Sequence, residues 1–223
     1  MKQFPELIRV SIPVEEGLIE GDLTLPENAR AAVIFAHGSG SGRHSPRNKY
    51  VAEVLNQARL STLLIDLLTA EEERVDIGTA EYRFNIGLLA SRLIAATDWA
   101  DKHPVLSNFP IGYFGASTGA AAALVAAAKR PERIGAIVSR GGRPDLAQRQ
   151  FDRVIAPTLL IVGEFDGEVI ALNRIAAMAM RAPKQIKIVP GATHLFEEEG
   201  ALEKVASLAS EWFKKNLVRR KAA

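Results

Sequence analysis

The 223-residue chain contains no cysteine. Disulfide bridges, thiolate nucleophiles and cysteine-ligated metal sites are therefore excluded. The chain also lacks an H-E-x-x-H motif and any Cys/His cluster, so we do not expect a metal-dependent hydrolase. Neither a G-x-G-x-x-G sequence nor a P-loop follows a predicted strand, and the sequence therefore gives no indication of a nucleotide cofactor.

Long apolar segments and a large excess of one charge are missing as well. No segment reaches membrane-spanning length, and the first residues contain no apolar run of signal-peptide length, so we expect a soluble cytoplasmic protein without a membrane partner. The 28 Lys and Arg residues nearly balance the 26 Asp and Glu residues. This balance gives no indication of a nucleic-acid partner.

The residues that are present favour one α/β domain. Hydrophobic residues make up 48% of the chain, which is enough to bury a full core. Short β-branched runs alternate with longer helical patterns, as is typical of a mainly parallel sheet with helices on both faces. We expect residues 1–223 to form a single domain without a large lid, with an antiparallel hairpin at the N-terminus. The predicted strands are 7–12, 18–25, 31–36, 61–65, 111–114, 134–138, 158–162 and 186–189. The predicted helices are 48–58, 79–103, 118–130, 169–181 and 200–217.

In such sheets ligands bind outside the carboxyl ends of the strands, so the loops that follow strands are of most interest. Residues 115–119 follow a predicted strand and read GASTG, which fits G-x-S-x-G. A sharp strand-to-helix turn strains the backbone at the serine and leaves no room for bulky neighbours. A tight turn with a helix-capping serine would give the same pattern. Because the motif lies between a predicted strand and an Ala-rich helix, we interpret Ser117 as a nucleophile.

Two further loops carry a candidate acid and a candidate base. Asp166 follows the predicted strand 158–162, and His194 follows the last predicted strand. A serine hydroxyl needs an imidazole to accept its proton, and a carboxylate fixes the tautomer of that imidazole. Glu164 is a rival acid in the same loop, Asp166 could be a simple turn residue, and His194 could cap a helix or lie in the core. We favour Asp166 because it lies a little past the strand end, where the chain can turn toward His194.

The glycine-rich loop HGSGSG at residues 37–42 follows the predicted strand 31–36. Its three glycines allow the backbone to approach a ligand closely, although a merely flexible loop would have the same composition. In hydrolases with the chain order Ser…Asp…His, this loop supplies one backbone N–H of the oxyanion hole. The residue after the nucleophile supplies the other. The expected donors are therefore the amides of Ser39 and Thr118.

Together these segments resemble the α/β-hydrolases, and specifically the compact dienelactone hydrolase-like members. The resemblance covers nearly the whole chain and rests on HGSGSG, GASTG, TLLIVGEFD ending at Asp166 and GATH ending at His194. It implies an α/β-hydrolase fold, a carboxylic-ester or related acyl bond as substrate, and no cofactor. Dienelactone hydrolases have a cysteine nucleophile where this chain has Ser117. We therefore transfer the fold and the triad geometry but not dienelactone as the substrate.

These observations predict a serine hydrolase that cleaves small carboxylic esters, or related thioesters or lactones, through an acyl-enzyme intermediate. Because the chain has no room for a large lid, we expect an open site and small, soluble substrates. Two alternatives remain open from the sequence: a non-catalytic ligand-binding module on a hydrolase fold, and an acyltransferase. The sequence does not determine the oligomeric state.

Three arginines and one histidine lie in loops that should share the rim of this site. Arg140 and Arg143 follow a predicted strand, and His44 and Arg47 follow the glycine-rich loop. The forked guanidinium group is suited to a substrate carboxylate or phosphate. Alternatively these residues form ion pairs that brace the loops, which we favour, with acidic partners available at Asp145 and residues 71–73.

Overall fold

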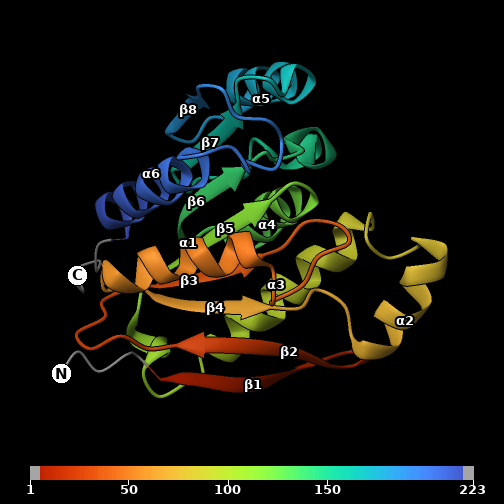
Figure 1. The fold of residues 1–223 in the computed structure, drawn as a ribbon. Helices are drawn as coiled ribbons and strands as arrows, with labels where there is room; N and C mark the ends of the chain where they lie inside the picture. Colours follow the sequence, from red (N-terminus) through yellow and green to blue (C-terminus); the bar gives the residue numbers. More distant parts are fainter. Residues whose placement is uncertain (1–5, 218–223) are drawn as a thin grey trace.

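The computed structural model describes residues 6–217 and contains an eight-stranded sheet with the strand order β1-β2-β4-β3-β5-β6-β7-β8 (Figure 1). β1 and β2 form an antiparallel hairpin at the sheet edge, β2 pairs antiparallel with β4, and the remaining neighbours are parallel. The predicted fold class, a mostly parallel sheet with an antiparallel N-terminal hairpin, is confirmed. The strands are β1 (Leu7–Val14), β2 (Gly17–Thr24), β3 (Ala32–Ala36), β4 (Ser61–Ile65), β5 (Ile111–Ala116), β6 (Ile134–Arg140), β7 (Thr158–Gly163) and β8 (Lys184–Val189).

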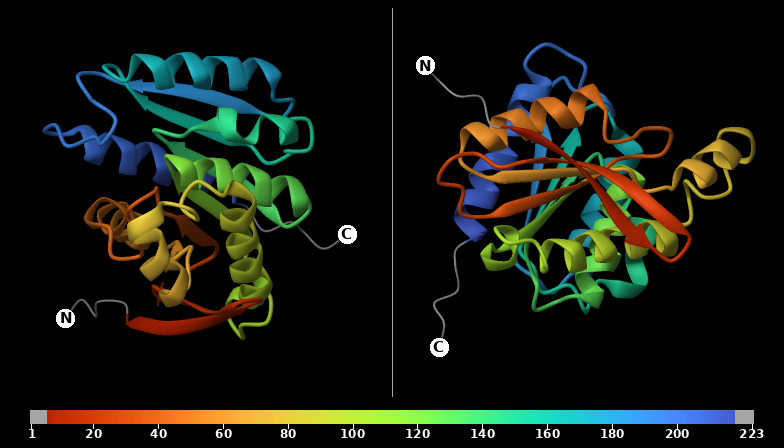
Figure 2. Two further views of the ribbon diagram at one scale, coloured as in Figure 1. Left: turned by 90° about the vertical axis from the view of Figure 1, so that its right-hand side faces the viewer. Right: turned by 90° about the horizontal axis from the view of Figure 1, so that it is seen from below.

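Helices cover both faces of this sheet (Figures 1 and 2). α1 and α6 pack on one face, and α3, α4 and α5 pack on the other. Short 3-10 turns at Leu106–Asn108 and Pro144–Gln150 complete the described part of the chain. The helices are α1 (Pro46–Gln57), α2 (Ala70–Thr79), α3 (Ile86–Ala100), α4 (Thr118–Lys129), α5 (Gly167–Ala179) and α6 (Ala201–Asn216).

The central strands are continuous apolar runs because both of their faces are buried. In β6, Ile137 belongs to the core beneath α3 and α4, whereas Ala136 and Val138 belong to the core beneath α1 and α6. This alternation follows from the two-residue period of a strand. It places the side chain of Arg140, the last residue of β6, on the α1/α6 face.

The carboxyl ends of the parallel strands meet at one edge of the sheet. Ala36 of β3 is in register with Gly115 of β5, and Ala116 is in register with Arg140 of β6. Farther along, Gly163 of β7 is in register with Val189 of β8. The loops after β3, β5, β6, β7 and β8 are therefore neighbours, and these loops contain the residues singled out from the sequence.

The predicted helix over residues 79–103 is wrong in its first part. The chain instead forms α2 and α3 with a break between them, and Phe84 in this break is 59% exposed. Ala80 adopts a left-handed conformation that ends α2, and the Asn85 side chain accepts a hydrogen bond from the Leu88 N–H at the start of α3. The carboxylate of Asp76 accepts hydrogen bonds from the backbone N–H groups of residues 82 and 83, which fixes the break.

α2, which was not predicted from the sequence, stands away from the sheet (Figure 2). Its start carries a capping box: the Thr69 hydroxyl accepts from the Glu72 N–H, and the Glu72 carboxylate accepts from the Thr69 N–H. The T-A-E-E sequence is a signal that could have identified this helix. Glu72 also accepts a hydrogen bond of 2.6 Å from the buried Arg92 of α3, which ties α2 to the rest of the domain.

Candidate active site

Ser117 occupies the turn between β5 and α4 with φ of 50° and ψ of −118°. A positive φ is rare for residues other than glycine and costs roughly 1–3 kcal/mol. Neighbouring backbone groups hold the turn, since the Ser117 N–H donates to the Arg140 carbonyl at 3.1 Å and the Ser117 carbonyl accepts from the Arg143 N–H at 3.2 Å. Strain that the surrounding structure maintains in this way is typical of functional positions.

The two glycines of the motif are required by close packing. A Cβ atom on Gly119 would lie 2.3 Å from the carbonyl oxygen of Ala36 and 2.4 Å from that of His37. A Cβ atom on Gly115 would lie 2.5 Å from Cα of Ala120 in α4. The first turn of α4 therefore packs directly against the ends of β3 and β5, which leaves the serine at the carboxyl edge of the sheet.

Asp166 and His194 are joined by a hydrogen bond. Oδ2 of Asp166 lies 2.6 Å from Nδ1 of His194. Asp166 occupies the N-cap position of α5, yet its side chain makes no capping hydrogen bond and contacts the histidine instead. Its rival, Glu164, accepts a hydrogen bond of 2.8 Å from the Gly191 N–H and forms no hydrogen bond with His194. Of the two acids, Asp166 is the one paired with the histidine.

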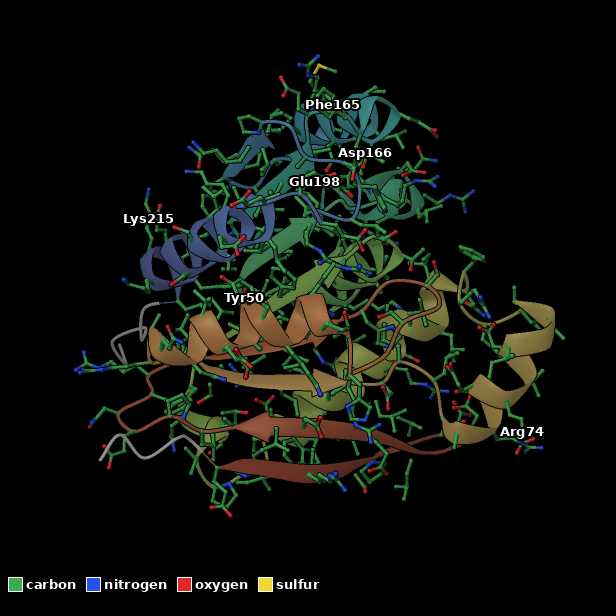
Figure 3. The ribbon with its side chains drawn as sticks, in the orientation of Figure 1. Tyr50, Arg74, Phe165, Asp166, Glu198 and Lys215 are labelled. Atoms are coloured by element: carbon green, nitrogen blue, oxygen red, sulfur yellow. The ribbon has the colours of Figure 1, made fainter. Side chains whose placement is uncertain are left out.

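Close backbone contacts position the histidine loop. The Phe165 N–H donates to the Ala192 carbonyl at 2.9 Å, which joins the loop after β7 to the loop after β8. A Cβ atom on Gly141, the residue after β6, would lie 3.4 Å from Nδ1 of His194, so the glycine backbone packs against the imidazole ring. Figure 3 shows Asp166 in the first of these loops and Glu198 at the end of the second.

The glycine-rich loop lies beside the serine. A Cβ atom on Gly38 would lie 3.3 Å from Cβ of Ser117. A small cavity of about 10 Å³ is lined by residues that include Gly38, Ser39 and Thr118. The two residues expected to supply amide donors therefore line one recess next to Ser117.

His37 holds this loop in place. Its Nε2 accepts a hydrogen bond of 3.0 Å from the Leu67 N–H, and its Nδ1 lies 2.9 Å from the Gly38 carbonyl. The first bond requires an unprotonated Nε2, so the ring is neutral with its proton on Nδ1. Burial lowers the pKa of His37, which favours the same neutral form. Both ring nitrogens of His37 are therefore engaged in holding the glycine-rich loop.

An ion pair that the sequence analysis missed also anchors the loop. The guanidinium group of Arg43 is paired with the carboxylate of Asp66, and the Arg43 N–H donates to Oδ1 of Asp66 at 2.7 Å. Gly42 is needed here, because a Cβ atom at that position would lie 2.9 Å from Oδ1 of Asp66. Asp66 directly follows β4, and its place at the carboxyl edge is the signal that could have identified it.

The four rim residues have different surroundings in the structure. Arg143 forms two hydrogen bonds of 2.9 and 2.8 Å with Asp145, which is the bracing pair expected as the alternative. Arg47 donates to Glu197 at 2.7 Å, and His44 lies 3.6 Å from Asp22 with its side chain 60% exposed. Arg140 differs from these three residues, because it is buried and its side chain forms no hydrogen bond or ion pair with any residue from 6 to 217.

Within residues 6–217, no group of three or more His, Asp or Glu side chains is arranged to hold a metal ion. Over the same range, no helix has both the length and the apolar character needed to cross a membrane.

The sheet, the strained serine turn and the loops at the carboxyl edge together define an α/β-hydrolase fold. A model of the dienelactone hydrolase family matches residues 68–217, and the chain belongs to this family. A crystal structure of a dienelactone hydrolase from Anabaena variabilis ATCC 29413 is 57% identical to this chain, with a TM-score of 0.95, and the match covers 97% of this chain and 100% of that chain. Est1E from Butyrivibrio proteoclasticus shares the fold at 16% identity and a TM-score of 0.78, over 93% of this chain and 98% of that chain.

The chain is also similar to two curated proteins of Mycobacterium tuberculosis, from strains CDC 1551 / Oshkosh and H37Rv. Each bears the name "Putative phosphoribosyl transferase" and is 57% identical over 195 residues. The match covers 87% of this chain but only 43% of each relative. The chain therefore spans less than half the length of these relatives.

Proposed function

We propose that the protein is a serine hydrolase that cleaves small carboxylic esters, with Ser117 as nucleophile, His194 as general base and Asp166 as the residue that orients the base. Related acyl bonds, such as those of thioesters and lactones, fit the same chemistry. The observation that carries the proposal is the strained backbone of Ser117, at the same sheet edge as a hydrogen-bonded histidine and aspartate.

In the proposed reaction, Oγ of Ser117 attacks the acyl carbon while Nε2 of His194 accepts the hydroxyl proton. Asp166 bonds to Nδ1, which keeps the proton of the neutral ring on that nitrogen and leaves Nε2 free to accept another. The amides of Ser39 and Thr118 stabilise the oxyanion of the tetrahedral intermediate. His194 then protonates the leaving alcohol, and afterwards activates the water molecule that hydrolyses the acyl-enzyme.

Two kinds of relative support a hydrolase. The family is named for a hydrolase, and the 57% identical Anabaena variabilis structure is a dienelactone hydrolase. Since this chain has Ser117 where the sequence resemblance leads us to expect cysteine, its substrate is proposed from its own site and not from the family name.

The name of the Mycobacterium tuberculosis relatives points to a different reaction. We assign phosphoribosyl transfer to the part of those relatives that lies outside the match, since the matched part carries the hydrolase fold and the serine turn. An assay of this chain for phosphoribosyl transfer should therefore give no product. Product formation would instead assign phosphoribosyl transfer to the matched part of the relatives.

The test of the proposed function is covalent labelling together with turnover. The unmutated protein should hydrolyse p-nitrophenyl acetate and react with a fluorophosphonate probe at Ser117. Ser117→Ala should lose both properties while its circular dichroism spectrum is unchanged. Absence of labelling and turnover in the unmutated protein would instead favour a binding module that has no catalytic activity. To separate hydrolysis from acyl transfer, product analysis with and without added alcohols should show the free acid as the main product.

A further inference from the structure

Asn173 is a fully buried polar residue in the middle of α5. The Nδ2 group of its amide donates two hydrogen bonds, to the Gly142 carbonyl at 3.0 Å and to the Val169 carbonyl at 2.8 Å. Its Oδ1 atom has no hydrogen-bond partner among residues 6–217. A buried oxygen without a partner destabilises the fold, and leucine would form a helix more readily than asparagine. Helix stability therefore does not explain the asparagine, and the bond to Gly142, outside the helix, indicates another role.

The group that Asn173 binds is part of a peptide unit that also contacts the candidate nucleophile. The carbonyl of Gly142 and the N–H of Arg143 belong to the same trans peptide. That N–H donates to the Ser117 carbonyl at 3.2 Å. Because a trans peptide is planar, its C=O and N–H point in opposite directions. One rigid unit is therefore held by Asn173 on one side and bonded to Ser117 on the other.

Close packing leaves this peptide little freedom to move. A Cβ atom on Gly142 would lie less than 3.0 Å from Oγ of Ser139 and from Cβ of Ala120 in α4. Gly142 therefore fits tightly between β6 and α4, while α5 supplies the hydrogen bond to its carbonyl. The preceding residue, Gly141, packs its backbone against the ring of His194. The short segment after β6 thus contacts both the candidate nucleophile and the candidate base.

The helix that carries Asn173 also begins at the candidate acid. Asp166 is the N-cap residue of α5, and its carboxylate lies 2.6 Å from Nδ1 of His194. The amide of Asn173, about two turns later, joins this helix to the peptide that supports the serine turn. Ser117 has a φ of 50°, a strained conformation that persists only when the surrounding contacts maintain it.

We propose that Asn173 is a positioning residue that, through the peptide it binds, holds the strained turn of Ser117 at the correct distance from His194. Its side chain acts on catalysis only through the backbone and does not contact the reacting atoms. This proposal rests on the proposed hydrolase function and adds a residue to the same site. Without the bond to Gly142, the turn should relax and Oγ of Ser117 should move relative to Nε2 of His194.

Asn173→Leu tests this role, because it removes both hydrogen bonds and keeps a side chain of similar size. The kcat for p-nitrophenyl acetate should fall about 10- to 100-fold, the range for a misplacement of about 1 Å. KM should be unchanged, since acylation and deacylation both depend on the distance between Ser117 and His194. The rate constant of fluorophosphonate labelling should fall by a similar factor. The Tm should change little, because the variant loses the bond to Gly142 but also removes the unpaired Oδ1 atom.

Asn173→Ser separates the two hydrogen bonds of the amide. The serine hydroxyl can still donate to the Val169 carbonyl, one helical turn earlier, but it is too short to reach Gly142. This variant should therefore lose kcat and labelling rate as Asn173→Leu does, and it serves as the test if the leucine variant does not fold. Retention of both rates in a folded variant at position 173 would overturn the proposal.

Ala176→Gly is the matched control for a loosened helix. Ala176 is also buried in α5, three residues after Asn173. Glycine at this position should lower the Tm by about 1–4 °C, but kcat and the labelling rate should be unchanged. A loss of activity equal to that of Asn173→Leu would show that mobility of α5 is sufficient, which would refute a specific role for the amide. If the unmutated protein neither hydrolyses p-nitrophenyl acetate nor reacts with the probe, the proposed function itself fails, and the role of Asn173 fails with it.

Discussion

Nδ1 of His194 lies 2.6 Å from Oδ2 of Asp166, although the two residues are 28 positions apart and follow different strands. The pairing arises because β7 and β8 are parallel neighbours whose carboxyl ends lie at the same edge. Asp166 is the first residue before α5 and could have capped that helix, yet its carboxylate contacts the histidine. Asp166 is therefore expected to act through the histidine and not through the helix.

Asp166→Asn should lower kcat by about 10⁴-fold, because an amide at this position favours the wrong tautomer of the histidine. Glu164→Gln is the matched control in the same loop. Its side chain accepts a hydrogen bond from the Gly191 N–H, and the carbonyl oxygen of glutamine can still accept that bond. Steady-state kinetics with p-nitrophenyl acetate would measure both effects, and a larger loss for Glu164→Gln would reassign the acid.

Ser117→Gly should be more stable than Ser117→Ala by about 1 kcal/mol, although both variants are inactive. Glycine adopts a φ of 50° without strain, whereas alanine retains the Cβ atom that makes this conformation costly. The greater chain entropy of unfolded glycine offsets part of the gain. Urea unfolding monitored by circular dichroism would measure the difference. A glycine variant less stable than the alanine variant would contradict the view that the turn is strained.

Gly119→Ala should destabilise the protein by about 3 kcal/mol or more and reduce activity. Its added methyl group would overlap the carbonyl oxygens of Ala36 and His37, and backbone atoms cannot move aside cheaply. Gly78→Ala in α2 is the control, since nothing lies within 4 Å of its added methyl group. That change should stabilise by about 0.5–1 kcal/mol through helix propensity. Unfolding curves of the two variants would show opposite shifts, and similar shifts would refute the packing argument.

The free energy of unfolding should fall as the pH is lowered below about 6.5, in part because of His37. Burial holds the pKa of His37 below the value of an unfolded histidine, so the unfolded chain binds this proton more readily than the folded chain. The contribution of His37 is therefore complete above the unfolded pKa and is lost as the pH falls through the folded pKa. The slope from this one group can reach about 1.4 kcal/mol per pH unit.

His37→Gln should reduce this pH dependence, because glutamine does not titrate and its carbonyl oxygen can accept from the Leu67 N–H. His103→Gln, near the end of α3, controls for the loss of a histidine elsewhere. Urea unfolding at pH 7.5, 6.5 and 5.5 would provide the slopes. If His37→Gln keeps the full slope of the unmutated protein, other groups are responsible for it.

Much of the fold could be predicted because its main signals are local. Strands buried on both faces are continuous apolar runs. Examples are Ala32–Ala36 and Thr158–Gly163, in which every residue is buried. The loops at the carboxyl edge were identified for the same reason, since each one directly follows such a run. The helix over residues 79–103 was wrong because its break depends on hydrogen bonds from Asp76 in α2, a helix that lacks a clear apolar face.

The sequence by itself determined the order of the motifs along the chain: the GASTG turn, then the acidic loop, then the histidine loop. Only the tertiary structure decided between chemically equal side chains. It paired Asp166 and not Glu164 with His194. It also paired Arg143 with Asp145, while the buried side chain of Arg140 has no ion-pair partner among residues 6–217. The physical reason is that composition and spacing record which groups a segment carries. Which charged groups form ion pairs depends on the register and packing of strands that are far apart in the chain. Residues 47 and 197, for example, form an ion pair although they are 150 positions apart.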